Sequence, residues 1–335
     1  MTDHIQAVDY KAPLWCKNRH VQSLLATVKL RKIFVKKRAR SLINHASEHI
    51  VQSNDGAKLQ SFVSLQENKN SPMVILIHGW EGSHESLYLL SAANHLFQSG
   101  YHVVRLNLRD HGTSHHLNPE LFHSNRLAEV IDAVAAIERQ YTPTQLHLCG
   151  FSLGGNFVLR VANSADSLGI NLSKVIAICP ALNPADILLK LETSLSIYIK
   201  YFMFKWKRSL RKKQYHFPEL YDIERDLQTD SMRELTEKLV AYYGDYASIN
   251  EYFEGYNITG NTLNRLRCES HILLAKDDPI IDFKDIYSLP NEENISLYSS
   301  ENGGHCGFIK NIQLHSWLDD FIIEILKDNT EHLST

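Results

Sequence analysis

The sequence is poor in cysteine, and its few cysteines do not form the close pairs that hold zinc or iron. Their number is odd, which favours a reducing compartment over a framework of disulfides. We therefore predict five free, buried thiols, at Cys16, Cys149, Cys179, Cys268 and Cys306.

A long uninterrupted apolar run is also missing. The most apolar long stretch, residues 184–206, is broken by charged residues such as Asp186, Lys190 and Glu192, which are too many for a membrane-spanning helix. The first residues include the acidic Asp3 and lack the basic stretch and apolar core of a secretory signal. We therefore predict no transmembrane segment and a cytoplasmic location.

Charge of one sign does not dominate either. The formal net charge of -3 over 335 residues gives no general attraction to nucleic acid. With 44% hydrophobic and 22% charged residues, the composition is that of an ordinary globular domain with enough material for a large core. We expect one large domain, with room for an insertion.

Short apolar runs alternate with helical periodicity along most of the chain. Strands are predicted at residues 48–52, 58–63, 73–77, 101–108, 145–149, 174–179, 271–274 and 295–299, and helices at 87–97, 124–140 and 312–325. Repeated strand, helix, strand order predicts the α/β class, with a mostly parallel central sheet covered by helices on both faces. Functional loops are then expected at the carboxyl ends of the strands.

A serine lies between glycines where a predicted strand meets a predicted helix. Residues 150–156 place Ser152 between Gly150 and Gly154, and these glycines would let the strand and the helix approach closely. An ordinary glycine-rich turn has the same composition, so the pattern alone is weak. The flanking strand and helix favour a nucleophile elbow.

A serine nucleophile needs a histidine base, and that histidine needs a carboxylate. Asp277 and Asp278 follow a predicted strand, and a histidine among glycines follows the last one. Their order in the chain is typical of this sheet architecture. We predict Ser152 as nucleophile, Asp278 as acid and His305 as base. Asp278 is preferred because it directly precedes a proline turn, and Asp277 stays the alternative.

The reaction also needs hydrogen-bond donors for the oxyanion. We expect the backbone N–H groups of Leu153 and Trp80, each such donor being worth ~10²–10³ in turnover. His78 and Gly79 would support the second donor, and the loop at Asp110 would brace the site from below.

Several histidines lie together in sequence and raise the question of a metal site. They do not combine with a carboxylate at a spacing that completes a metal site. We therefore predict no metal and no cofactor. The histidines are His111, His115, His116 and His123.

The chain divides by pattern into an arm, a core and a cap. The predicted segments are an arm at residues 1–45 that packs on the core, an α/β core at 46–181 and 266–330, and a helical cap inserted at 182–265. The basic run at 29–40 is interpreted as a solvated face, with attraction to an anionic membrane as the alternative. The aromatic and basic run at 197–208 could pack on the core, line an acyl pocket or contact a membrane surface.

Taken together, these motifs resemble the YheT-like α/β-hydrolases, bacterial hydrolases related to membrane-lipid and acylglycerol hydrolases of animals. The matching pieces are residues 13–15, 20–23, 78–83, 107–112, 150–156, 277–279 and 303–308. The resemblance implies the same roles for Ser152, Asp278 and His305, and the hydrolysis of short-chain esters or acylglycerols. The cap is unusually basic and aromatic at 200–213, so substrate preference is the least transferable part.

We therefore expect a serine hydrolase that cleaves short-chain or lipid-derived carboxylic esters through an acyl-enzyme. Its partner would be a small-molecule or lipid ester and not nucleic acid, with contact to the inner face of the membrane through the basic cap as a further hypothesis. An acyltransferase using the same triad is one alternative. A non-catalytic ligand-binding protein on the same fold is another, since fold does not fix function.

Overall fold

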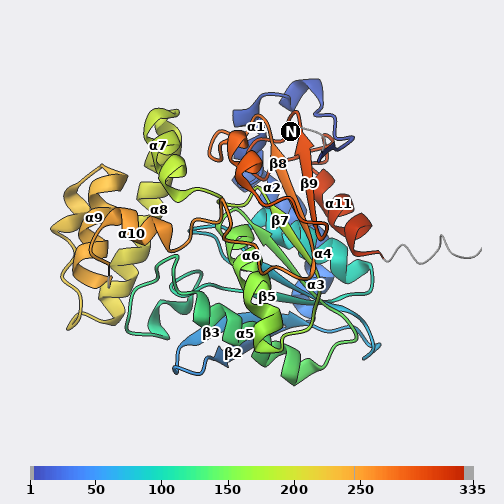
Figure 1. Cartoon of the computed structure of the whole chain (residues 1–335), viewed down its shortest axis with the longest axis horizontal. Helices are drawn as coiled ribbons and strands as arrows, with labels where there is room; N and C mark the ends of the chain where they lie inside the picture. The colour runs from blue at the N-terminus through green and yellow to red at the C-terminus, as the bar shows by residue number, and fades with distance from the viewer. Residues whose placement is uncertain (1–3, 245, 328–335) are drawn as a thin grey trace, which may run out of the picture.

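The computed structural model describes residues 4–244 and 246–327. Within them, nine strands form one sheet in the order β1-β9-β8-β7-β6-β4-β5-β3-β2 (Figure 1). They are β1 (Ile5–Ala7), β2 (Ala46–Gln52), β3 (Lys58–Ser64), β4 (Met73–Ile77), β5 (His102–Leu106), β6 (Leu146–Phe151), β7 (Leu172–Ile178), β8 (Glu269–Ala275) and β9 (Ile295–Ser300). All neighbours run parallel except the β2–β3 and β3–β5 pairs. The predicted α/β class and mostly parallel sheet are confirmed.

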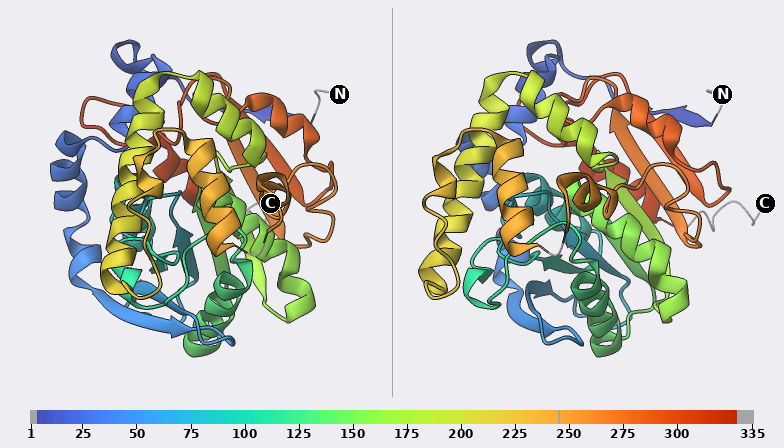
Figure 2. Two further views of the ribbon diagram at one scale, coloured as in Figure 1. Left: turned by 90° about the vertical axis from the view of Figure 1, so that its left-hand side faces the viewer. Right: turned by 60° about the vertical axis from the view of Figure 1, so that its left-hand side comes forward.

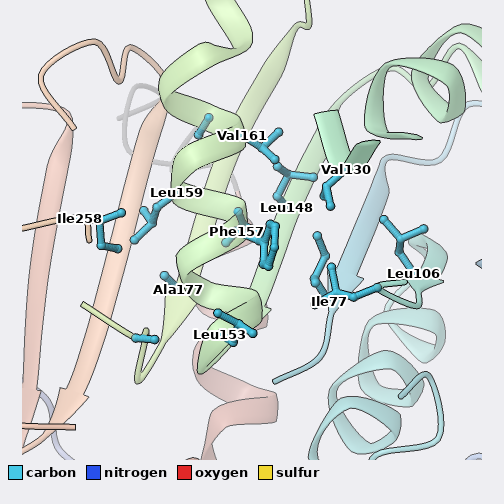
Figure 3. Packing of buried hydrophobic residues seen from close by; sticks show 14 of the residues in the cluster. Ile77, Leu106, Val130, Leu148, Leu153, Phe157, Leu159, Val161, Ala177 and Ile258 are labelled. Atoms are coloured by element: carbon cyan, nitrogen blue, oxygen red, sulfur yellow. The ribbon is translucent and has the colours of Figure 1, made fainter. Parts of the chain in front are cut away.

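Helices cover both faces of the sheet because the central strands are apolar on both sides. Val74 and Leu76 of β4 pack with α4 (Leu87–Gln98) and α11 (Trp317–Leu326). Ile75 and Ile77, pointing the other way, pack with α5 (Leu127–Tyr141) and α6 (Leu153–Ala165). Figure 3 shows Ile77 and residues of α6 in the second of these layers. Burial on both faces explains the continuous apolar runs in the sequence.

The start of the last helix and one edge strand differ from the prediction. The last helix begins at Trp317 and not at residue 312, because Ile309 bridges to Ser316 and Leu314 adopts a left-handed φ of 60°. Ile312 is therefore an exposed loop residue. The short strand β1 was not predicted from sequence, and it pairs with β9 at the sheet edge.

The N-terminal arm folds into three helices beside the sheet. They are α1 (Arg19–Leu25), α2 (Lys29–Arg38) and α3 (Arg40–Asn44). Arg31 in the basic run is fully buried, and its guanidinium donates hydrogen bonds to the carbonyls of Ala26 and Leu314. The prediction of a solvated face is therefore wrong for Arg31, although Lys32 and Lys37 are exposed.

In the described part of the chain, four α-helices between β7 and β8 lie to one side of the sheet, and they are called the cap below (Figure 1). They are α7 (Pro184–Thr193), α8 (Ser196–His216), α9 (Met232–Tyr243) and α10 (Ile249–Glu254). Along α8, Tyr198 and Met203 are buried, whereas Ile197 and Phe204 are 51% and 65% exposed. Packing on the body thus accounts for only part of the aromatic run.

Three further observations bear on the sequence predictions. Among the described residues, no helix is both long and apolar enough to cross a membrane. The cysteines are free, four of them are buried, and Cys268 is partly buried. Residues 1–3 of the predicted arm, residue 245 of the predicted cap and residues 328–330 of the predicted core lie outside the described residues.

Candidate active site

Ser152 lies at a sharp turn between β6 and α6. Its backbone has φ 54° and ψ -119°, a strained conformation that L residues rarely adopt. A Cβ on Gly150 would lie 2.2 Å from the carbonyl oxygen of Gly154, and one on Gly154 would lie 2.2 Å from that of Ile77. Glycine is therefore required at both positions for the strand and the helix to approach this closely.

The three residues predicted as a triad lie in one hydrogen-bonded row. His305 Nε2 is 2.9 Å from Ser152 Oγ, and His305 Nδ1 is 2.8 Å from Asp278 Oδ2. The other oxygen of Asp278 accepts hydrogen bonds from the N–H groups of Ile280 and Ile281, at 2.7 and 3.0 Å. Asp278 is buried, so its carboxylate is held in one orientation toward the imidazole.

The neighbouring Asp277 faces another partner. Its Oδ1 accepts a hydrogen bond from the backbone N–H of Gly304 at 2.9 Å. Burial raises the pKa of its carboxyl group, while the N–H of Gly304 counteracts this effect. Asp277 therefore contacts the backbone of the histidine loop, and Asp278 contacts the ring.

The loop after β4 is held by buried neutral groups. His78 Nε2 accepts a hydrogen bond from the N–H of Leu108 at 3.2 Å, and its Nδ1 donates to the carbonyl of Gly79 at 2.8 Å. Burial holds the pKa of His78 well below its usual value, so the ring is neutral in this tautomer. The N–H of Gly79 donates to the hydroxyl of Tyr88 at 3.0 Å.

A second neutral histidine fixes the other end of this loop. The N–H of Glu81 donates to His111 Nε2 at 3.1 Å, and burial lowers the pKa of His111 to about 4. The amide groups on both sides of Trp80 are thus already bonded, at Gly79 and at Glu81. Trp80 and Leu153 both line the cavity that contains Ser152.

The arm contacts the loop that carries His305, a role that sequence reasoning missed. The N–H of His305 donates to Ser23 Oγ at 2.9 Å. Gln22, fully buried, accepts a hydrogen bond from the N–H of Ile309 at 2.7 Å, and the hydroxyl of Tyr10 donates to the carbonyl of Ile309. The motif at residues 20–23 was the signal available in the sequence, although it did not indicate this contact.

Asp110 connects the loop after β5 to the cap. Its Oδ1 is 2.7 Å from Lys213 Nζ on α8, and its Oδ2 accepts a hydrogen bond from the N–H of Phe122. Burial raises the pKa of Asp110, and the ammonium group of Lys213 opposes that shift. The cap is therefore joined to the body through a buried ion pair near the site.

The histidines considered as metal ligands have separate partners. His111 holds the N–H of Glu81, and His115 Nε2 lies 2.8 Å from Ser209 Oγ on α8. His123 packs edge-on against Tyr246. Burial lowers the pKa of both His115 and His123 to about 3, so these rings are neutral packing groups between the body and the cap.

A mostly apolar cavity of about 340 Å³ opens beside Ser152 and His305. Trp80 stacks on Phe202 of the cap with ring centroids 5.5 Å apart. Other side chains that line the cavity from the cap and its connections are Leu188, Leu191, Ile197, Trp206 and Phe253. A serine hydroxyl, a histidine ring and an apolar space thus meet where the carboxyl ends of the strands face the cap.

The fold and these motifs define the class of protein. A family model described as "alpha/beta hydrolase fold" matches residues 72–311, which is most of the chain. The chain therefore belongs to the α/β hydrolase fold family.

Within this class the chain is similar to esterases and lipases. It is 25% identical over 276 residues to the Escherichia coli protein named "Putative esterase YheT", with 78% of this chain and 80% of that protein covered. It is 22% identical over 344 residues to monoacylglycerol lipase ABHD2 of Mus musculus, with 94% and 79% covered. These matches confirm the resemblance to YheT-like α/β-hydrolases.

A solved structure supports the fold independently. The crystal structure of a membrane phospholipase A described as a bacterial virulence factor matches with a TM-score of 0.58 and 21% identity, over 91% of this chain and 90% of that one.

Proposed function

We propose that this protein is a serine hydrolase that cleaves carboxylic esters through an acyl-enzyme. The observation that carries the proposal is the row of contacts from Ser152 Oγ through His305 to Asp278, at the wall of an apolar cavity. The esterases and lipases among its relatives support an ester, small or lipid-derived, as the substrate.

In the acylation step His305 Nε2 takes the proton of Ser152 Oγ as the oxygen attacks the ester carbonyl. Asp278 stabilises the imidazolium ion that forms. The oxyanion receives hydrogen bonds from the N–H groups of Leu153 and Trp80, and the alcohol leaves with the proton from His305.

Deacylation repeats these steps with water as the nucleophile. His305 takes a proton from water, and Ser152 Oγ is the leaving group that regains a proton. The acid product then leaves the apolar cavity. The ester and one water molecule supply all the atoms of the two products, an alcohol and an acid, and His305 returns each proton that it takes.

The test is hydrolysis of p-nitrophenyl esters, from acetate to palmitate, by the wild type and by Ser152→Ala. We expect turnover to fall by about 10⁴ or more in the variant, and a fluorophosphonate probe to label Ser152. Ser164→Ala in α6, whose hydroxyl bonds to the carbonyl of Arg160, is the matched control and should retain activity. Equal inactivity of wild type and variant, without labelling, would contradict the proposal.

Product analysis separates hydrolysis from acyl transfer. Both reactions share the acyl-enzyme, so both would be lost in Ser152→Ala. If an added alcohol receives most of the acyl group at concentrations far below that of water, the protein is an acyltransferase. Free acid as the main product supports the hydrolase.

We further propose that the face of the molecule formed by α8 and α2 contacts membranes peripherally. Ile197 and Phe204 of α8 are exposed, as are Ile33 and Phe34 of α2, and both helices also carry exposed lysines. Surfaces that lie at the membrane–water interface typically combine exposed apolar side chains with basic ones. Arm and cap lie on the same side of the molecule (Figure 2).

Co-sedimentation with vesicles tests this contact. Wild type should sediment with vesicles rich in anionic lipid, and an Ile33→Asp/Phe204→Asp variant should stay in the supernatant. Leu168→Asp is the control, because this exposed leucine follows the far end of α6. Wild type that stays in the supernatant with every vesicle would exclude the contact.

A further inference from the structure

A second cavity, of about 420 Å³, lies beside the apolar one. It is bounded by the arm, by the loops after β4 and β5, and by α8. Five residues line both cavities: Thr27, Gly82, Ser86, Tyr201 and Lys205. A ligand that fills the apolar cavity could therefore extend a polar part into the second one.

Basic side chains from two elements line this second cavity. Lys205, Arg208 and Lys212 follow one another at intervals of three and four residues on α8, and this spacing places them on one face of a helix. Lys32 of α2, in the arm, also lines this cavity. The cations thus converge from the cap and from the arm.

Two of the three carboxylates in the lining are paired with lysines outside it. Asp110 is 2.7 Å from Lys213, and Glu85 is 2.6 Å from Lys36. Glu81 remains as the carboxyl group that faces the basic side chains of the cavity. The lining therefore carries more positive than negative charge.

Glu81 itself offsets only part of that charge at neutral pH. Burial raises the pKa of its carboxyl group to about 7, against the opposing effect of Lys205, Arg208 and Lys212. Its carbonyl oxygen accepts a hydrogen bond from Lys205 Nζ, which places this ammonium group at the border of the two cavities. Arg208 and Lys212 are exposed to the second cavity from α8.

We propose that the second cavity binds an anionic group of phosphate type, carried by the alcohol part of the ester substrate. The proposal rests on the proposed hydrolase function, since it names the substrate class of that site. Guanidinium groups bind phosphate oxygens in pairs, and ammonium groups add point charges. The acyl chain would occupy the apolar cavity, the ester would lie at Ser152, and the phosphate would lie among Lys32, Arg208 and Lys212.

Binding is tested first, without turnover, on the Ser152→Ala protein. Glycerol 3-phosphate, inorganic phosphate and uncharged glycerol are titrated by calorimetry. We expect both phosphates to bind and glycerol not to bind. Adding Arg208→Gln and Lys212→Gln should weaken phosphate binding at least tenfold. Arg211→Gln is the matched control, because Arg211 pairs with Glu224 and does not line the cavity.

Turnover distinguishes a substrate head group from a free anion. A medium-chain monoacylglycerol and its phosphorylated counterpart are compared below their micellar concentrations. We expect wild type to have the higher kcat/KM for the phosphorylated ester, and the ratio of the two values to fall at least tenfold in Arg208→Gln/Lys212→Gln. The ratio should not change in Arg211→Gln. Unfolding midpoints show whether each variant is folded.

The outcomes separate the two proposals. Absence of phosphate binding, or equal binding by the double variant, overturns the anion site. Binding of phosphate with the same turnover ratio in wild type and double variant means that the anion is a free one, and overturns the head-group assignment. Phosphate binding that depends on Arg208 and Lys212, in a protein that hydrolyses no ester, supports the anion site and contradicts the hydrolase.

Discussion

At the scale of single residues, the two adjacent acids after β8 have different partners. Asp277 and Asp278 are adjacent, so pattern alone favours one over the other only weakly. Two backbone N–H groups, of Ile280 and Ile281, fix Asp278 toward His305. Asp277 instead holds Gly304. The difference depends on the path of the chain after each carboxylate, which spacing in a sequence does not encode.

Replacing Asp278 should therefore remove most of the catalysis. We expect Asp278→Asn to lower kcat by about 10³–10⁴, because an amide would hold the imidazole of His305 in the wrong tautomer and would not stabilise its cation. Steady-state hydrolysis of p-nitrophenyl acetate measures kcat, and the rate of the initial p-nitrophenol burst measures the acylation step alone.

The matched variant is Asp277→Asn. An asparagine oxygen can still accept the hydrogen bond from Gly304, so we expect kcat within about tenfold of wild type. If Asp277→Asn abolishes the burst and Asp278→Asn retains it, the assignment of the acid is wrong.

At the scale of elements, two basic stretches contain a buried cation each, and charge patterning did not predict either. Arg31 in α2 donates to carbonyls that include that of Leu314, and Lys213 in α8 donates to Asp110 and to the carbonyl of Asn118. Runs of like charge are usually solvated. Each exception depends on at least one acceptor about a hundred residues or more away in the chain, Leu314 for Arg31 and Asp110 for Lys213, which only the assembled fold brings close.

We predict that Lys213→Met destabilises the protein by about 3–5 kcal/mol, because it leaves the buried Asp110 carboxylate without its cation. Chemical unfolding followed by circular dichroism measures this change. The same substitution at the exposed Lys200, also on α8, should cost less than about 0.5 kcal/mol.

A double variant checks the cause of that loss. In Lys213→Met/Asp110→Asn the buried charge is gone, while an amide oxygen can still accept from Phe122. We expect it to recover at least half of the lost stability. A double variant no more stable than Lys213→Met would show that packing of the lysine stem, and not the ion pair, joins cap to body.

At the scale of the whole molecule, the parallel sheet followed from the sequence because buried strands need apolar residues on both faces, as at residues 73–77. The turn at Ser152 could be predicted because Gly150 and Gly154 are required where the strand and the helix approach closely. The contacts of the arm with the histidine loop did not follow, since they join Ser23 to His305 across the chain. The edge strand β1 has three residues, too few for an alternating pattern.

Neutral histidines that are buried or partly buried should make the stability of the whole protein sensitive to acid. Burial lowers the pKa of His84 and His111 to about 4 and that of His115 and His123 to about 3, from 6.5. Below pH 6.5 the unfolded chain binds protons at these rings and the folded chain does not. Stability is therefore expected to fall as the pH drops from 6.5 toward 3 to 4, each ring contributing up to about 1.4 kcal/mol per pH unit.

His115→Gln tests this linkage at one ring, because the glutamine amide can still bond to Ser209. Urea unfolding between about pH 7.5 and pH 4.5 should give a slope of stability against pH that is smaller by up to about 1.4 kcal/mol per unit in the variant. Glu81, with its raised pKa, contributes to stability with the opposite pH dependence. This contribution is the same in wild type and His115→Gln, so it cancels when the two slopes are subtracted. His116→Gln, which removes an exposed neighbouring ring, is the matched control variant. Equal slopes of stability against pH for wild type and His115→Gln would mean that His115 is protonated in the folded protein. In that case α8 would not shield the ring from solvent.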